Sequence, residues 1–162
     1  MLRRAYAWRR LDRTAQARPD TSEDDTMLIR LIYASEATDP LTPDSVQTIV
    51  THARQANTRR HLTGMLVFDH RAFLQVLEGQ REVVSEVYGR IAADQRHRRL
   101  VLMDVLPIDE RMFANWGMGF AAADALGREQ FLRFGGSDNF DPHGMTAAAG
   151  LGLLRALSQL VK

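Results

Sequence analysis

The 162-residue sequence contains no cysteine, which excludes disulfide bonds, thiolate metal sites and thiol nucleophiles. Long hydrophobic runs are also missing, because no stretch approaches the roughly 20 apolar residues needed to span a bilayer. An excess of one charge is missing as well, since 21 basic and 20 acidic residues leave a formal net charge of +1. This balance provides no overall field that would attract nucleic acid or an anionic membrane.

Metal-binding patterns are scarce too, because none of the five histidines stands in an HxxxH or HExxH arrangement. We therefore expect no metal site. The 45% hydrophobic and 25% charged residues are typical of a globular protein, and the length suits one domain.

The composition divides the chain into three segments. Residues 1–26 are rich in arginine and then in acidic residues, which predicts a flexible extension outside the folded core. Residues 27–122 carry the strand and helix patterns of a domain. Residues 123–162 form a C-terminal extension that reads as two helices joined by a loop at Gly135–Asn139.

Apolar runs within residues 27–122 predict strands at 28–35, 62–68, 72–77, 100–106 and 116–121. A first helix is expected after Thr42 and Pro43, which are favoured at the start of a helix, and a second after Gly79. The resulting βαββαββ order predicts an α+β, ferredoxin-like sheet with both helices on one face. We expect the two C-terminal helices to cover the other face, with self-association as a second role.

Two polar side chains fall on apolar strand faces. Residues two apart in a strand share a face, so Tyr33 lies with Leu31, and Gln75 lies with Phe73 and Leu77. Each polar residue taken alone is compatible with ordinary core packing. A buried phenol and a buried amide need hydrogen-bond partners, however, and a polar ligand is one way to supply them.

Five segments of the sequence together resemble one family. They are LIRLIYAS, TRRHLTGMLVF, FLQVLEG, YGRIAADQRH and NWGMGF. Their order and spacing over residues 27–122 resemble the BLUF family of flavin-using blue-light receptors. The resemblance implies a noncovalently bound FAD, with FMN as the alternative, held between the two helices.

The resemblance also assigns roles to residues. Those implied to bind the cofactor are Tyr33, Ile49, Asn57, Gln75, Arg90, Ile91 and Asp94. Ile49 and Ile91 would face the two sides of the flavin ring, and Asn57 its polar edge. Arg90 and Asp94 would lie near the ribityl chain and ring edge, although their spacing also suits an exposed i,i+4 salt bridge.

Tyr33 and Gln75 match the two photoactive residues of the family. The resemblance implies that the excited flavin takes an electron and a proton from the tyrosine, and that recombination leaves the glutamine amide rotated or tautomerised. Trp116 and Met118, expected on one face of the last strand, match residues that relay this change; plain packing is the alternative.

One departure from the family concerns Ala56, where many members have a polar residue, so one contact to the flavin is expected to be missing. Ser35, Arg96 and His97 match positions with supporting roles. No GxGxxG motif follows a strand, so a Rossmann-type cradle is not expected.

The predicted function is a cytoplasmic blue-light photoreceptor without enzymatic activity. Its output would be a changed interaction with an effector protein or with copies of itself, and we expect a homo-oligomer that binds neither nucleic acid nor membrane. One alternative is a small hydrolase using Asp94, Arg96 or His97. Another is a nucleic-acid-binding module that uses the arginine-rich start.

Overall fold

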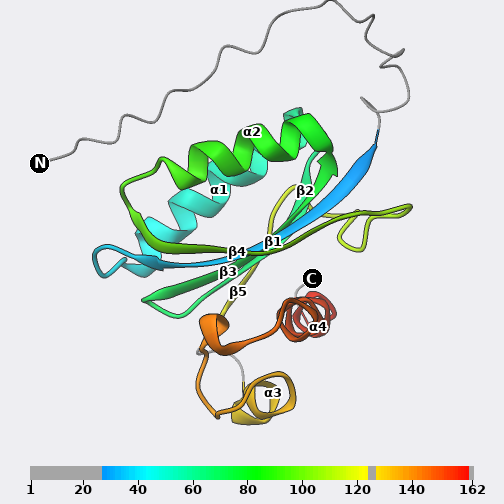
Figure 1. Ribbon diagram of the computed structural model, residues 1–162. Helices are drawn as coiled ribbons and strands as arrows, with labels where there is room; N and C mark the ends of the chain where they lie inside the picture. The colour runs from blue at the N-terminus through cyan, green and yellow to red at the C-terminus, as the bar shows by residue number, and fades with distance from the viewer. Residues whose placement is uncertain (1–26, 124–126, 161–162) are drawn as a thin grey trace, which may run out of the picture.

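A five-stranded sheet forms the centre of the computed structural model, which describes residues 27–123 and 127–160 (Figure 1). Its strands are β1 (Leu28–Ala37), β2 (Thr63–Phe68), β3 (Ala72–Gln80), β4 (His97–Pro107) and β5 (Gly119–Ala122). They lie in the order β4-β1-β3-β2-β5, and every neighbouring pair is antiparallel except β2 and β5. The predicted α+β, ferredoxin-like arrangement is confirmed, whereas the predicted extension at residues 1–26 lies outside the described residues.

Helices α1 (Pro43–Arg59) and α2 (Arg81–Ala92) lie on the same face of the sheet, as predicted (Figure 1). The start of α1 follows from local chemistry, because the hydroxyl of Thr42 accepts a hydrogen bond from the backbone N–H of Ser45. Helix α2 has no side-chain cap and follows directly from the end of β3.

The turn between β2 and β3 forms without glycine. His70 has a φ of 73°, in the left-handed region that glycine adopts most readily. The carboxylate of Asp69 accepts hydrogen bonds from the backbone N–H groups of Arg71 and Ala72, at 3.2 and 2.7 Å. These bonds stabilise the hairpin that joins the two strands predicted at 62–68 and 72–77.

The strands bury apolar side chains on both faces, so the sheet separates two cores. The core on the helix face includes Leu31, Tyr33, Val46, Val50, Leu66, Leu77 and Val84. The core on the opposite face includes Ile32, Met65, Leu74, Val76, Leu153, Leu154 and Leu157. Consecutive strand residues therefore contribute to different cores.

The C-terminal segment forms α3 (Arg128–Phe134), the short 3-10 helix η3 (Pro142–Gly144) and α4 (Ala147–Ser158). Helix α4 covers the second face of the sheet directly: a Cβ atom at Gly150 would lie 3.3 Å from Ile32 and 3.4 Å from Leu74. Helix α3 lies farther from the sheet (Figure 1), and the ring of Phe134 packs against Gly152 of α4. The expected covering is thus made by α4, with α3 outside it. Within the described ranges, no helix is long and apolar enough to cross a membrane.

Candidate cofactor site between α1 and α2

A cavity of about 570 Å³ opens between α1, α2 and β3. Six of the residues predicted to bind the cofactor line it: Ile49, Asn57, Gln75, Arg90, Ile91 and Asp94. Tyr33 does not line the cavity and is buried behind Gln75, with 1% of its surface exposed. The fold therefore gathers residues from three elements that are separate in the sequence.

Tyr33 and Gln75 are directly opposite each other in the antiparallel pair of β1 and β3. The Tyr33 hydroxyl donates a hydrogen bond to Oε1 of Gln75. Burial raises the pKa of Tyr33, and the neighbouring Tyr88 raises it further. The Tyr88 ring lies edge-on at 5.5 Å between ring centroids. Tyr33 is thus held as a neutral phenol with its proton directed at the amide.

Met118 is the second partner of the Gln75 amide. The Gln75 side-chain nitrogen donates to Met118 Sδ at 3.4 Å, and Met118 is completely buried. Helix α1 holds this segment, because Arg54 Nε donates to the Met118 carbonyl at 3.1 Å. Asn57 Nδ2 donates to the Gly117 carbonyl at 2.9 Å.

The prediction that Trp116 and Met118 share a face of the last strand is wrong. Strand β5 begins at Gly119, so both residues precede it. Met118 packs in the core on the helix face, whereas Trp116 packs in the core on the opposite face. Alternation with a period of two holds only in a regular extended strand, and residues 116–118 are irregular.

Charged residues surround the cavity in two groups. Glu86 accepts from Arg60 at 3.1 Å and from Arg90 at 2.5 Å, which joins the end of α1 to α2. Asp94 pairs with Arg96 at 2.6 Å. The hydrogen bond from Arg96 lowers the pKa of Asp94 to about 2.

The alternative interpretation of Arg90 and Asp94 as an i,i+4 salt bridge is therefore not supported. Each residue pairs with a different partner, Glu86 in one case and Arg96 in the other. Both nevertheless line the cavity, as the resemblance implies.

The lining suits a flat aromatic ring with polar edges. Ile49 from α1 and Ile91 from α2 supply aliphatic surface on two sides, and burial of ring faces against such groups is favourable. Gln75 and Asn57 supply amide groups for a polar edge. Ala56 also lines the cavity, so this position offers a methyl group and no hydrogen bond. The residues present fit a flavin.

Sequence reasoning missed other lining residues, among them Thr48, His52 and Arg60. Thr48, His52 and Ala56 are spaced by four residues, which places them on one face of α1. Steps of four residues back from Ala56 could have found this face. Arg60 is the C-cap of α1, where helical periodicity no longer predicts the direction of a side chain.

A buried carboxylate outside the predicted site anchors the loop that carries Met118. Glu78 is completely buried and pairs with Arg30 at 2.7 Å. The same carboxylate accepts from the backbone N–H groups of Met112 at 3.1 Å and Phe113 at 2.9 Å. No sequence motif indicated this cluster, because its members come from β1, β3 and the loop after β4.

The hydrolase alternative finds little support in the arrangement of its residues. His97 Nδ1 lies 2.9 Å from Ser35 Oγ, but Ser35 is completely buried and so out of reach of a substrate. Asp94 is paired with Arg96 and does not orient the imidazole. Burial lowers the pKa of His97.

Comparison with known proteins agrees with this geometry. The family of sensors of blue-light using FAD matches residues 28–119. The structure of BlsA in its photo-activated state is similar, with a TM-score of 0.72 and 31% identity over 82% of this chain and 95% of that chain.

Two curated relatives are longer proteins. The photoactivated adenylate cyclase subunit beta-like protein FB of Euglena gracilis is 31% identical over 103 residues, 63% of this chain and 12% of that protein. The blue light- and temperature-regulated antirepressor BluF of Escherichia coli (strain K12) is 36% identical over 94 residues, 57% of this chain and 23% of that protein. The chain thus spans less than a quarter of either relative. From the matched residues and the paired Tyr33 and Gln75, the chain belongs to the BLUF family of flavin-dependent blue-light sensors.

Proposed function

We propose that this chain is a blue-light receptor that holds FAD or FMN between α1 and α2 and signals through a rearrangement of hydrogen bonds. The hydrogen-bonded series from Tyr33 through Gln75 to Met118 carries the proposal. Residues 27–122 would form the sensor and residues 123–162 a helical extension. When bound, the flavin supplies absorption of blue light and a photo-oxidant.

The contacts of Gln75 explain how a rotation of its amide group would displace a neighbouring side chain. Its oxygen accepts from Tyr33, and its nitrogen donates to Met118. A half-turn of the amide would exchange these atoms, so that the Tyr33 oxygen must accept from an N–H group. Met118 Sδ would then face an oxygen, and neither atom can donate. Rotation of Gln75 therefore requires Met118 to move.

A movement of Met118 would affect packing on both faces of the sheet. The backbone of residues 117 and 118 is bonded to Asn57 and Arg54 of α1, while Trp116 lies on the other side of the sheet. We propose Trp116 and Met118 as the relay on these grounds, although they do not share a face.

The output would be a changed interaction with a separate effector protein or with a second copy of the chain. Two relatives carry names that join light to adenylate cyclase or to an antirepressor, which supports an effector as the recipient of the signal. We propose no enzymatic activity for the chain itself and a cytoplasmic location; localisation of a fluorescent fusion tests the latter.

Reconstitution with FMN or FAD tests the proposed function. The protein should bind flavin, shift its visible absorption to longer wavelength under blue light and recover in the dark. A protein that stays colourless after reconstitution would contradict the proposal. The two dissociation constants, measured by flavin fluorescence, decide between FMN and FAD.

Tyr33→Phe provides the sharper test, because it removes the hydroxyl that donates to Gln75. We expect it to retain flavin and to lose the reversible shift. Tyr88→Phe is the matched control, since its ring packs against Tyr33 from α2. An unaltered photocycle in Tyr33→Phe would remove this residue from the proposed mechanism.

A further inference from the structure

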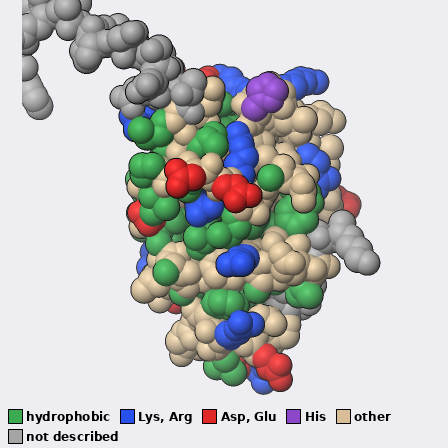
Figure 2. All heavy atoms as spheres, turned by 90° about the vertical axis from the view of Figure 1, so that its right-hand side faces the viewer, with side chains coloured by type: hydrophobic (Ala, Val, Ile, Leu, Met, Phe, Trp, Pro, Cys, Tyr) green, Lys and Arg blue, Asp and Glu red, His purple; other side chains and the backbone are tan. Residues whose placement is uncertain are grey.

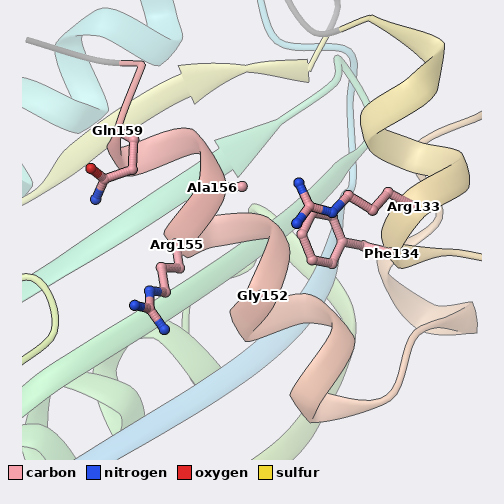
Figure 3. A pocket seen from close by; sticks show the side chains of 6 residues that line it. All are labelled: Arg133, Phe134, Gly152, Arg155, Ala156 and Gln159. Carbon is pink, nitrogen blue, oxygen red and sulfur yellow. The ribbon is translucent and has the colours of Figure 1, made fainter.

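A second cavity, of about 470 Å³, lies on the outer side of α4, remote from the flavin site. We call it the α3/α4 groove; its lining residues are Arg133, Phe134, Gly152, Arg155, Ala156 and Gln159. Figure 3 shows Gly152 and Ala156 on α4, with Arg133 and Phe134 to one side and Arg155 and Gln159 to the other. The groove thus has small residues along its base and basic side chains at its margins.

The two arginines of the groove have no carboxylate partner among the described residues. Arg128 of the same helix α3, by contrast, pairs with Asp138 at 3.2 Å. The Arg133 guanidinium lies 5.1 Å from the centre of the Phe134 ring, which holds it over an apolar surface. Residues 147–158 of α4 include Arg155 and no acidic residue.

Two residues that line the α3/α4 groove have an exposed apolar residue next to them in the sequence. Leu132 is 58% exposed and precedes Arg133, and Leu160 is 67% exposed and follows Gln159. These are the two most exposed large hydrophobic residues in the described part of the chain. On the face that Figure 2 presents, basic side chains follow one another down the middle among apolar ones, with acidic side chains beside them in the upper half and at the lower tip.

From these observations we propose that the α3/α4 groove binds an amphipathic, acidic helix of a separate effector protein. The Phe134 ring of α3 packs against Gly152, and Ala156, one helical turn further along α4, adds a small apolar side chain beside that ring for a second helix to pack on. Glutamate or aspartate at the margins of that helix would pair with Arg133 and Arg155, and its apolar face would cover the base.

A second copy of the chain fits this groove poorly. In a two-fold dimer, residues near the axis face their own copies, so a dimer with this groove at its axis would bring Arg133 and Arg155 against the arginines of the other copy. Like charges directly opposed across an interface are unfavourable. The groove itself is lined by no acidic residue, so a second copy of the groove does not supply the complementary charge.

The groove is placed to respond to light, and this point rests on the proposed function. Its helix α4 contacts Ile32 and Leu74 through Gly150. Those two residues directly precede Tyr33 and Gln75 in their strands. A change in the photoactive pair therefore lies one residue away from side chains that touch α4.

A display library tests the groove on the intact chain. The probes are helical peptides of about 16 residues, roughly four turns, with Leu or Ala on one face and Glu or Lys randomised on the other. Selection on the flavin-loaded protein in the dark should enrich Glu over Lys. No enrichment, or enrichment of Lys, would overturn the proposal.

Affinities of the selected peptides, measured by fluorescence anisotropy, complete the test. We expect a loss of at least about tenfold in R133E/R155E and none in R59E/R71E, which makes the same charge change away from the groove. Arg133→Gln/Arg155→Gln should show a smaller loss and serves if the reversal impairs folding. Equal binding by wild type and both groove variants would overturn the assignment.

Two further readouts separate the alternatives. Sedimentation that shows a wild-type dimer lost in R133E/R155E would assign the groove to a second copy and overturn the proposal. The visible spectrum is recorded on the same samples, so a missing red shift would contradict the proposed function while the dark affinities still test the groove. A difference between the peptide affinities measured in the dark and under blue light would link binding at the groove to the light response.

Discussion

The side-chain nitrogen of Gln75 lies 3.4 Å from the sulfur of Met118, and this contact makes Met118 the direct neighbour of the photoactive pair. Trp116 is two residues away in sequence but packs on the opposite side of the sheet. Substitutions at the two positions should therefore have separable effects.

Met118→Ala should alter the photocycle and lower stability. The residue is completely buried, and truncation of such a side chain costs about 2 to 5 kcal/mol. Without the sulfur, the Gln75 nitrogen loses its partner, so we expect a changed absorption shift and a changed recovery time. Chemical unfolding and flash spectroscopy measure the two effects.

Trp116→Phe is the companion variant, because it keeps an aromatic ring on the opposite face. We expect the absorption of the dark state to remain that of the wild type. A displaced dark-state maximum in this variant, together with a wild-type absorption shift and recovery time in Met118→Ala, would reverse the roles given to the two residues.

Gln75→Leu should abolish the reversible red shift while flavin remains bound. Leucine is apolar and of comparable size, and it offers neither an acceptor to Tyr33 nor a donor to a new partner. Gln55→Leu, an exposed glutamine in α1, is the matched control and should behave like wild type. Persistence of a normal shift in Gln75→Leu would exclude the amide from the signalling step.

Glu78→Ala should destabilise the fold strongly. The substitution leaves Arg30 without its partner and frees the backbone N–H groups of Met112 and Phe113. Breaking a buried ion pair in this way costs about 3 to 5 kcal/mol. Urea unfolding of the flavin-free protein measures the loss, and Glu82→Ala, an exposed glutamate in α2, should show no comparable change.

Glu78→Gln examines the anchoring of the loop separately. The amide retains one acceptor for a backbone N–H group but loses the ion pair. We expect intermediate stability and greater proteolysis between residues 108 and 118. Wild-type resistance to protease in that segment would argue against Glu78 as the anchor.

His97 should make stability depend on pH below neutrality. Burial lowers its pKa in the folded protein, whereas the unfolded value is about 6.5. As the pH falls through about 6.5, the unfolded chain takes up a proton that the folded chain does not, so the free energy of unfolding falls. As the pH is lowered, the urea midpoint of unfolding should fall less steeply in His97→Gln than in the wild type. The same dependence on pH in both proteins would contradict the prediction.

The regular parts of the fold follow directly from sequence pattern. The start of α1 at Thr42 and Pro43 and the strands predicted at 62–68 and 72–77 are local features, and each lies near its predicted place. The direct pairing of Tyr33 with Gln75 depends on strand register. Sequence predicted the shared apolar environment of these residues but could not supply that register.

The errors and omissions arise where the backbone is irregular or the contacts are distant. Trp116 and Met118 were placed by strand alternation in a segment that is not a strand. The Arg30–Glu78 pair joins residues 48 positions apart and repeats no pattern that a single sequence reveals. Arg90 had two acidic neighbours one helical turn away, and only the three-dimensional structure shows that it pairs with Glu86.

Ile32 and Tyr33 are consecutive in β1, yet one touches the helix α4 side and the other the flavin side. One peptide unit therefore separates the side chain that packs toward α4 from the phenol that bonds to Gln75. The insertion or deletion of a single residue within β1 would exchange the two sides and turn the phenol toward the wrong core. The length of this strand is therefore tied to the ability of the chain to perceive light.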